Sequence, residues 1–123
     1  DFAADGYGLW AVEIPGEASF IGFVGLMGVP EEMPFAPALE IGWRLARAYW
    51  GRSLAFEAAD AVFAFAFEEV GVRELVSYTA ALNTRSRRLM ERLGMRYEPG
   101  ADFPHPGIAD GHELQPHVLY RAP

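Results

Sequence analysis

The sequence contains no cysteine, and this absence excludes several kinds of chemistry. A chain without thiols has no disulfide scaffold, no thiolate zinc site and no cysteine nucleophile. No apolar run approaches the ~18 residues needed to cross a bilayer, and no basic-then-apolar leader is present. We therefore expect a soluble cytoplasmic protein that has no membrane partner.

Basic residues are also scarce, because 10 of them face 17 acidic residues and give a net charge of −7. This balance argues against nucleic acid as a partner, since nucleic-acid binding draws on broad positive surfaces. All the basic residues are arginines, and five of them lie close together in the sequence: Arg85, Arg87, Arg88, Arg92 and Arg96. The cluster is compatible with a single anionic ligand, and a solvated helix face is the alternative reading.

The chain has enough apolar matter for one core, with 51% hydrophobic residues in a length of 123. We expect a single domain over residues 1–123. Its first part is predicted to be a hairpin of strands at residues 8–13 and 19–26 around a Pro15-Gly16 turn. A proline-rich loop over residues 27–37 follows and carries two acidic side chains, Glu31 and Glu32.

A strand, a tight turn and a helix form the centre of the chain. Residues 41–45 are predicted to be a buried strand, Gly51-Arg52-Ser53 a turn, and residues 54–70 a helix that ends at Gly71. This helix is apolar nearly all round, so we expect it to be packed on most sides. Free backbone N–H groups and the helix dipole at its start favour an anion such as phosphate, although many such units bind no ligand.

The second half continues with a strand at residues 74–79, which makes a parallel crossover with strand 41–45. Asn83 is expected to cap a helix over residues 84–93 by accepting a hydrogen bond from the Ser86 N–H, and Gly94 to stop it. A strand at 95–98, a long loop at 99–116 and a strand at 117–121 complete the pattern. The fold class is therefore α+β, with a mixed sheet.

Several sequence blocks then occur in an order that is informative. They are Glu40-Ile41-Gly42-Trp43-Arg44-Leu45, Tyr49-Trp50-Gly51-Arg52-Ser53-Leu54-Ala55, Asn83 with Ser86, Leu89-Met90-Glu91-Arg92-Leu93-Gly94-Met95, Phe103-Pro104-His105-Pro106 and His117-Val118-Leu119-Tyr120-Arg121. With these blocks the chain resembles the GNAT superfamily of acetyl-CoA-dependent N-acyltransferases. It is most similar to the branch that includes the N-terminal acetyltransferases of ribosomal proteins.

Two departures from the family pattern matter. The family usually has Gly where this chain has Ser53, so a close approach of pyrophosphate to the backbone is less easy here. The family also has a strand and two helices before the hairpin, which this sequence lacks. The resemblance thus implies an N-terminally truncated GNAT-like fold, and exposed apolar surface left by the missing part favours a homodimer.

The resemblance implies where acetyl-CoA binds. In the family the strands that correspond to residues 41–45 and 75–79 splay apart, and the pantetheine arm lies between them. Main-chain groups of Trp43, Arg44 and Leu45 would bond to it and polarise the thioester carbonyl. The pyrophosphate would be held by backbone amides of the turn and the helix start, namely those of Gly51, Arg52, Ser53, Leu54 and Ala55.

Two residues at the start of the second helix carry family roles. Asn83 and Ser86 would contact the cofactor, and the Ser86 hydroxyl would protonate the departing CoA thiolate. Ser86 lies three, four and seven residues before Leu89, Met90 and Leu93, so it shares their inward face. A plain helix cap at Asn83 and a filler hydroxyl at Ser86 are the alternatives.

Glu40 is the candidate general base, because the attacking amine must lose a proton. A strand-end carboxylate in solvent, or one paired with an arginine, is the other reading. Glu31 and Glu32 can instead attract a cationic acceptor. His105 can line the acceptor pocket, and Tyr120 is either a second proton donor or a core aromatic. The histidines lack the spacing of a metal site, although His105, Asp110 and His112 leave one conceivable; we expect none.

The resemblance implies an N-acetyltransferase that acts on a primary amine, either a protein N-terminus or a small molecule, by direct attack without an acyl-enzyme. The alternative is a CoA-binding or interaction module that has lost turnover. An unrelated α/β nucleotide binder is a weaker alternative, because no GxxxxGKS/T loop supports it.

Overall fold

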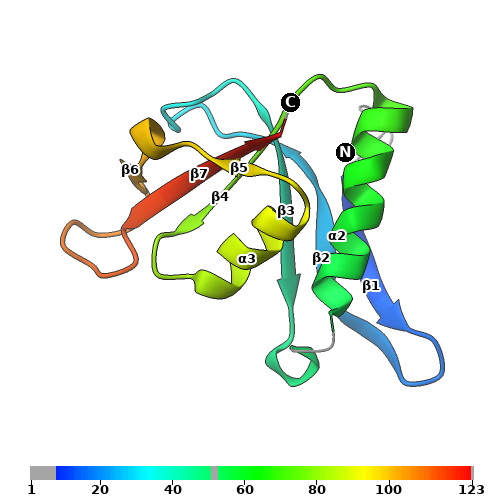
Figure 1. Ribbon diagram of the computed structural model, residues 1–123. Coiled ribbons are helices and arrows are strands. Elements are labelled where there is room, and N and C mark those ends of the chain that lie inside the picture. Colours follow the sequence, from blue (N-terminus) through cyan, green and yellow to red (C-terminus); the bar gives the residue numbers. More distant parts are fainter. Residues whose placement is uncertain (1–7, 51–52, 123) are drawn as a thin grey trace. The chain divides into compact units, whose positions relative to one another are not determined.

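The computed structural model describes residues 8–50 and 53–122 (Figure 1). Over these residues seven strands are hydrogen-bonded in the order β1-β2-β3-β4-β7-β5, with β6 paired to β7, and the fold is α+β as the sequence predicts. Two compact units make up the described chain. Unit 1 contains residues up to 27 and 41–73, and unit 2 contains residues 28–40 and those from 74 onward. The expected single domain stays a prediction.

Unit 1 begins with the predicted hairpin. Strand β1 (Leu9–Ile14) pairs antiparallel with β2 (Ala18–Gly28). The turn between them uses Gly16 at φ +82°, a backbone conformation that glycine adopts without steric cost. The two predicted strands and the Pro-Gly turn between them are therefore found where the sequence places them.

The rest of unit 1 follows the predicted order of strand, turn and helix. Strand β3 (Leu39–Leu45) enters it at Ile41 and is followed by a 3-10 helix, η1 (Arg47–Tyr49), and by α2 (Leu54–Phe65). The predicted helix to residue 70 ends differently, because its last turn is a π-helix, η2 (Ala66–Val70). Gly71 ends this helix in the left-handed conformation, as expected.

The expectation that this helix is packed on most sides is wrong. Its buried residues are Ala59, Val62 and Ala66, which form one stripe along the helix. Ala61 and Ala64 are exposed, as are all four acidic side chains. Alanine is so small that exposing it costs little, so an apolar sequence does not require burial all round. The aromatic ring of Phe65 contacts Trp10 of β1 edge to face, at a centroid distance of 5.4 Å.

Unit 2 is built on the antiparallel pairing of β4 (Leu75–Ala80) with β7 (Pro116–Ala122), which extends along all of β4. Two short strands, β5 (Arg96–Tyr97) and β6 (Phe103–Pro104), also pair with β7. The start of β3 pairs parallel with β4 through Glu40 and Val76, so the predicted parallel crossover is confirmed. The predicted loop 99–116 contains β6 and a 3-10 helix, η3 (Pro99–Ala101).

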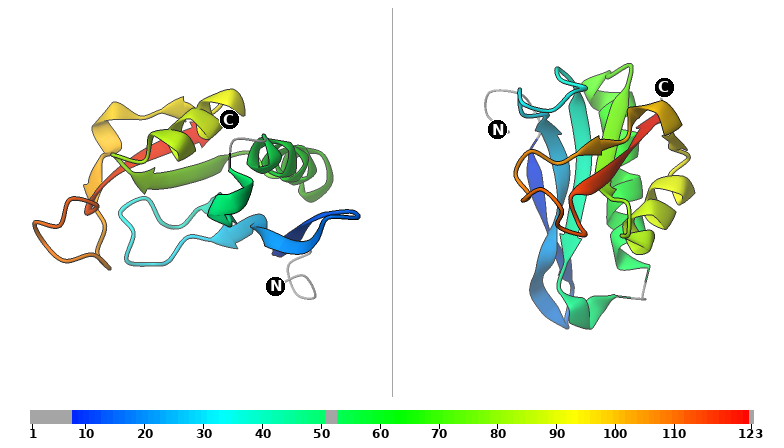
Figure 2. Two further views of the ribbon diagram at one scale, coloured as in Figure 1. Left: turned by 90° about the horizontal axis from the view of Figure 1, so that it is seen from below. Right: turned by 90° about the vertical axis from the view of Figure 1, so that its left-hand side faces the viewer.

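Helix α3 (Thr84–Arg92) has the predicted ends. Asn83 accepts a hydrogen bond from the Ser86 N–H at 3.2 Å, and Gly94 follows the helix at φ +90°. Leu89 and Met90 are its buried side chains. Both views in Figure 2 show α3 on one face of β4 and β7.

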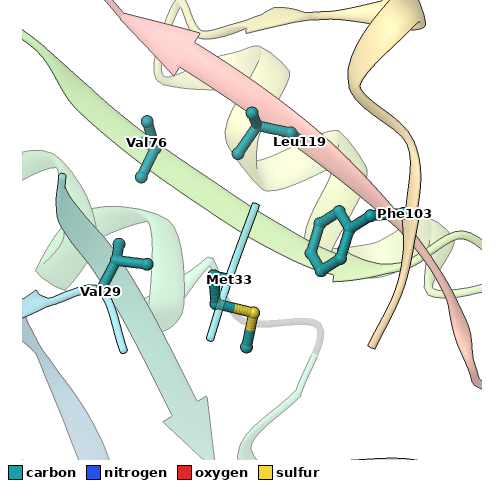
Figure 3. Packing of buried hydrophobic residues seen from close by; sticks show 5 residues of the cluster. All are labelled: Val29, Met33, Val76, Phe103 and Leu119. Carbon is teal, nitrogen blue, oxygen red and sulfur yellow. The ribbon is translucent and has the colours of Figure 1, made fainter. Parts of the chain in front are cut away.

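A hydrophobic cluster between the loop after β2 and the strands of unit 2 forms the core of that unit. Figure 3 shows its buried members: Val29, Met33, Val76, Phe103 and Leu119. The predicted loop over residues 27–37 therefore begins later than expected and contributes to the core. Strand β2 continues to Gly28, and the Val29 N–H donates to the Ala38 carbonyl oxygen at 2.9 Å.

Gly22 lies where the backbones of β2 and β3 approach closely. A Cβ atom there would lie 2.0 Å from the Arg44 carbonyl oxygen, and the φ of +156° adds strain. We predict that Gly22→Ala lowers the free energy of unfolding by about 2–4 kcal/mol, because β3 must shift. Urea unfolding measures this. Gly28→Ala in the same strand is the control, since no atom lies within 4 Å of its added Cβ. Equal losses for both variants would contradict the prediction.

Candidate functional site

Glu40 lies at the start of β3 and is half-buried. Its parallel partner is Val76, and Tyr78 stands two residues further along β4 on the same face. The Tyr78 hydroxyl donates a hydrogen bond to Glu40 Oε1 at 3.3 Å. Among residues 8–50 and 53–122, the carboxylate is thus neither an exposed strand end nor the partner of an arginine, the two alternatives that the sequence left open.

Burial gives this carboxyl group an unusual affinity for protons. Desolvation raises the pKa of Glu40 from 4.5 to about 7, against the opposing effect of the Tyr78 hydrogen bond, which favours the charged form. Burial and the neighbouring carboxylate also raise the pKa of Tyr78 to about 12. Near neutral pH, Glu40 can therefore take up and release a proton while Tyr78 stays a donor.

Aromatic rings surround Tyr78 within unit 2. Phe35 and Phe103 contact its ring edge to face, at centroid distances of 5.2 and 5.9 Å. The imidazoles of His105 and His117 lie 6.4 Å from it and 4.9 Å from each other. His105, which the sequence suggested for an acceptor pocket, is part of this cluster.

The start of α3 holds the two other unit 2 residues that the sequence singled out. Asn83 caps the helix, which is the structural alternative given above for this residue. A capping residue can still contact a cofactor. Ser86 is half-buried on the same side of the helix as the buried Leu89 and Met90. Its role as a proton donor stays a prediction.

Tyr120 is a core aromatic with an engaged hydroxyl. It is fully buried, accepts a hydrogen bond from Arg87 Nε at 3.2 Å and donates to Glu91 Oε2 at 3.0 Å. Arg87 also donates to the Ala81 carbonyl oxygen at 3.1 Å and lies over the ring of Tyr97. Arg87 therefore tethers α3 to its strands, whereas the other four arginines of the cluster are exposed.

In unit 1 the end of β3 is fixed by a tryptophan. The Trp50 indole N–H donates to the Leu45 carbonyl oxygen at 3.0 Å, and the Arg47 guanidinium lies over the Trp50 ring at 5.3 Å. Trp43 is half-buried and Arg44 is exposed. These are the strand residues that the family resemblance assigns to the pantetheine arm.

The turn before α2 has an unusual backbone at Ser53. This residue has φ +58° and ψ +16°, in the left-handed region, and its side chain makes no capping hydrogen bond. Gly51 and Arg52, also predicted to bind pyrophosphate, lie outside the described residues. The Ser53 carbonyl accepts the first helical hydrogen bond from Glu57 at 3.0 Å, so Leu54 and Ala55 lie in the first turn, whose N–H groups have no partner within the helix.

Within residues 8–50 and 53–122, no group of three His, Cys, Asp or Glu side chains could hold a metal ion. The side chains of the conceivable His105, Asp110 and His112 site support their loop instead. His105 Nδ1 accepts from the Gly107 N–H at 2.9 Å, and Gln115 Nε2 donates to Asp110 Oδ1 at 2.7 Å. Over the same ranges, the helices are all too short or too polar for a membrane span.

Comparison with known proteins gives the family. Residues 1–96 match the acetyltransferase (GNAT) domain model. The chain is 33% identical over 114 residues to "FsC-acetyl coenzyme A-N(2)-transacetylase" of Aspergillus fumigatus, covering 86% of this chain and 48% of that protein. The chain belongs to the GNAT acetyltransferase family. It spans about half the length of the curated relatives it matches.

Solved structures agree with this assignment. A protein described as a GnaT-family acetyltransferase from Bordetella pertussis superimposes with a TM-score of 0.82 at 28% identity, over 99% of this chain and 69% of that one. An acetyltransferase from Salmonella typhimurium, solved with its cofactor acetyl-CoA, has the same fold at 18% identity and a TM-score of 0.78, over 98% of this chain and 66% of that one. The particular branch of N-terminal acetyltransferases stays a prediction.

Sequence reasoning missed two residues of unit 2. Tyr78 had one signal available, because alternation along strand 74–79 puts it on the face of Val76. The parallel register that brings Glu40 to this face cannot be read from a single sequence. Arg87 was seen only as a member of an arginine cluster, and nothing in the spacing separates it from its exposed neighbours.

The left-handed Ser53 generates a prediction on stability. Ser53→Gly should raise the free energy of unfolding by about 1 kcal/mol, because glycine adopts this conformation without the Cβ penalty and no side-chain cap is lost. The exchange in the opposite direction, Gly71→Ser at φ +79°, should lower it by a similar amount. Thermal and urea unfolding measure both; a loss of stability in Ser53→Gly would contradict the argument.

The raised pKa of Glu40 generates a second prediction. Between pH 4.5 and about 7 the folded chain holds this proton more tightly than the unfolded chain, so this group lowers stability as pH rises through that window. Glu40→Gln should therefore stabilise the chain at pH 8 by on the order of 1 kcal/mol and change little at pH 5. Urea unfolding at both values tests it, and a gain that is equal at both pH values would count against the buried carboxylate.

Proposed function

We propose that this chain is part of an N-acetyltransferase that transfers the acetyl group of acetyl-CoA to a primary amine by direct attack in a ternary complex. Membership of the GNAT family supports this proposal, as does the similarity to the Aspergillus transacetylase. The single observation that carries it is Glu40, a half-buried carboxyl group with a pKa near 7. The amine must lose a proton to attack, and a general base accepts that proton best when its own pKa lies near the working pH.

The proposed reaction transfers the acetyl group in one direct attack. The amine nitrogen attacks the thioester carbonyl carbon, so that a C–N bond forms and the C–S bond breaks. Glu40 takes the proton that the amine loses, directly or through a water. Ser86 gives its hydroxyl proton to the departing CoA thiolate and regains one from water. The products are an acetamide and CoA.

We assign donor binding to the residues that the family resemblance names. The main chain of Trp43, Arg44 and Leu45 is assigned to the pantetheine arm, although the Leu45 carbonyl already accepts from Trp50 and is left out as an acceptor. Asn83 and Ser86 are also assigned to the cofactor. The pyrophosphate is assigned to the helix start in unit 1, with Gly51, Arg52, Ser53, Leu54 and Ala55.

A second candidate function is a CoA-binding module without turnover. The observation that favours it is Ser53, which places a side chain in the left-handed turn where the family usually has Gly. A Cβ and hydroxyl at this point reduce the room for a phosphate beside the backbone. If the Ser53 hydroxyl donates to a phosphate oxygen, it would instead favour binding. Measuring binding and turnover together distinguishes the two functions.

Partners and location follow from the proposed reaction. The substrates are acetyl-CoA and an amine acceptor, such as a protein N-terminus, a polyamine or an aminoglycoside. We propose a cytoplasmic location, because acetyl-CoA is an intracellular metabolite, and no nucleic-acid or membrane partner. The homodimer is retained as a proposal that sedimentation would test.

The test combines binding and turnover. We expect acetyl-CoA to raise the melting temperature, and CoA thiol to be released when a peptide with a free N-terminus, spermidine or kanamycin is added. Stabilisation without thiol release from any of these amines would favour the binding module. If neither effect occurs, the proposed function fails.

Two variants test the assigned roles. Glu40→Gln should lower kcat by about 10²-fold or more while acetyl-CoA still stabilises the protein, since only the base is lost. Ser86→Ala should lower kcat more than it weakens acetyl-CoA binding. Glu69→Gln, which changes an exposed carboxylate, is the control and should match the parent. If kcat in Glu40→Gln equals that of the control, Glu40 is not the base.

A further inference from the structure

We propose that Tyr78 is the positioning residue of Glu40: its clamped hydroxyl holds Oε1 and leaves Oε2 as the oxygen that accepts the proton. The inference rests on the proposed function and deepens it at one residue. Its starting point is the 3.3 Å hydrogen bond from Tyr78 to Glu40 Oε1. Neither the family resemblance nor the sequence spacing assigned any role to this tyrosine.

The tyrosine ring is held from several directions. Its backbone pairs with Leu119 of β7, which fixes the strand. Phe35 from the loop after β2 and Phe103 from β6 contact the ring edge to face and also contact each other, with centroids 5.2 Å apart. A ring packed in this way has few rotamers available, so its hydroxyl stays aimed at the carboxylate.

The two carboxylate oxygens of Glu40 differ in their surroundings. Oε1 accepts from Tyr78. Oε2 makes no hydrogen bond to the part of the chain that the structure describes. Because that part contains no buried side-chain oxygen or nitrogen without a partner, Oε2 must be in contact with solvent. Proton transfer to Glu40 is therefore directed to Oε2.

Among the described charged and titratable groups around Glu40 and Tyr78, the Tyr78 hydroxyl is the one that favours the ionised form of Glu40. Glu32 faces Tyr78 and raises its pKa, as Glu40 does. Burial lowers the pKa of His117, and the neighbouring His105 adds to this effect, so the neutral form of His117 is favoured. In the part of the chain that the structure describes, burial and the Tyr78 hydroxyl set the pKa of Glu40, and no cation adds to their effect.

Tyrosine suits this role better than the other hydroxyl residues would. Its pKa of about 12 keeps it protonated at every pH where the enzyme would work. Its rigid ring carries the hydroxyl across from β4 with two rotatable bonds, whereas a serine or threonine hydroxyl at position 78 would stay close to its own strand. The surrounding aromatic side chains pack against the tyrosine ring, and a smaller side chain would lose these contacts.

Tyr78→Phe removes the hydroxyl and keeps the ring, and two readouts follow it. Glutamate labelled with ¹³C at the carboxyl group reports the titration of Glu40 by NMR, assigned by its absence in Glu40→Gln. We expect the Glu40 midpoint to rise by about one pH unit, since the bond to the charged form is lost. We expect the acidic limb of kcat/KM to shift upward with it, giving roughly a five- to tenfold loss at pH 6 with acetyl-CoA and the fastest amine of the three above.

Tyr97→Phe is the matched control. The Tyr97 hydroxyl bonds to the Asp102 carboxylate at 2.7 Å, so this change also removes a tyrosine–carboxylate bond, away from Glu40. It should leave the Glu40 midpoint and the pH profile unchanged. Both variants are checked for an unaltered melting temperature at pH 5, where Glu40 is protonated and a bond to its charged form contributes little.

The outcomes separate the two proposals. An unchanged Glu40 midpoint in Tyr78→Phe overturns the positioning role, whatever the activity. A raised midpoint without a shift of the kinetic limb overturns Glu40 as the base, and the role of its positioning residue with it. A parallel shift of both supports the two together. If all three amines are inert, the proposed turnover fails, and the NMR midpoint still decides whether Tyr78 sets the proton affinity of Glu40.

Discussion

The parallel pairing of Glu40 with Val76 is the constraint on which the candidate chemistry depends. It brings a carboxylate from the start of one strand to the face of a neighbouring strand that carries Tyr78. The antiparallel partner of that strand, β7, holds it along its whole length. A carboxyl group in such a place loses water, keeps one hydrogen bond and acquires an affinity for protons near neutral pH.

Unit 1 supplies a different kind of feature, which lies in its backbone. Its strand β3 ends at Leu45, whose carbonyl oxygen accepts from the indole of Trp50, and the described chain resumes at Ser53 in a left-handed conformation. Because Gly22 has no Cβ, the Arg44 carbonyl oxygen can lie close to the backbone of β2. The side chains along this segment vary in exposure, so its fixed features are those of the main chain.

Much of the fold could be predicted from the sequence, because its boundaries carry local signals. The Pro15-Gly16 turn, the cap at Asn83 and the stops at Gly71 and Gly94 each have a residue type that a particular backbone conformation requires. Errors arose where tertiary packing decides. The loop after β2 contributes Val29 and Met33 to a core, and no local pattern distinguishes such a loop from a solvated one.

The candidate site was predictable in part, for the same reason. Glu40 could be named from its place in a family block, and the cap and inward face at Asn83 and Ser86 from helical spacing. The partner of Glu40 could not, since it lies 38 residues away and depends on strand register. The exception among the arginines, Arg87, depends on two tyrosines that meet it only in the folded unit.

The π-helical turn at the end of the unit 1 helix affects how this chain can change in length. The N–H groups of Gly71 and Val72 both donate to the Ala66 carbonyl, closing a turn that is one residue wider than an α-turn. Removal of one residue there would restore ordinary α-helical spacing and leave the preceding turns untouched. A deletion near the middle of α2 would instead rotate every later side chain by about 100° and carry Val62 and Ala66 off the buried stripe. Natural insertions and deletions in this helix should therefore collect beside Gly71.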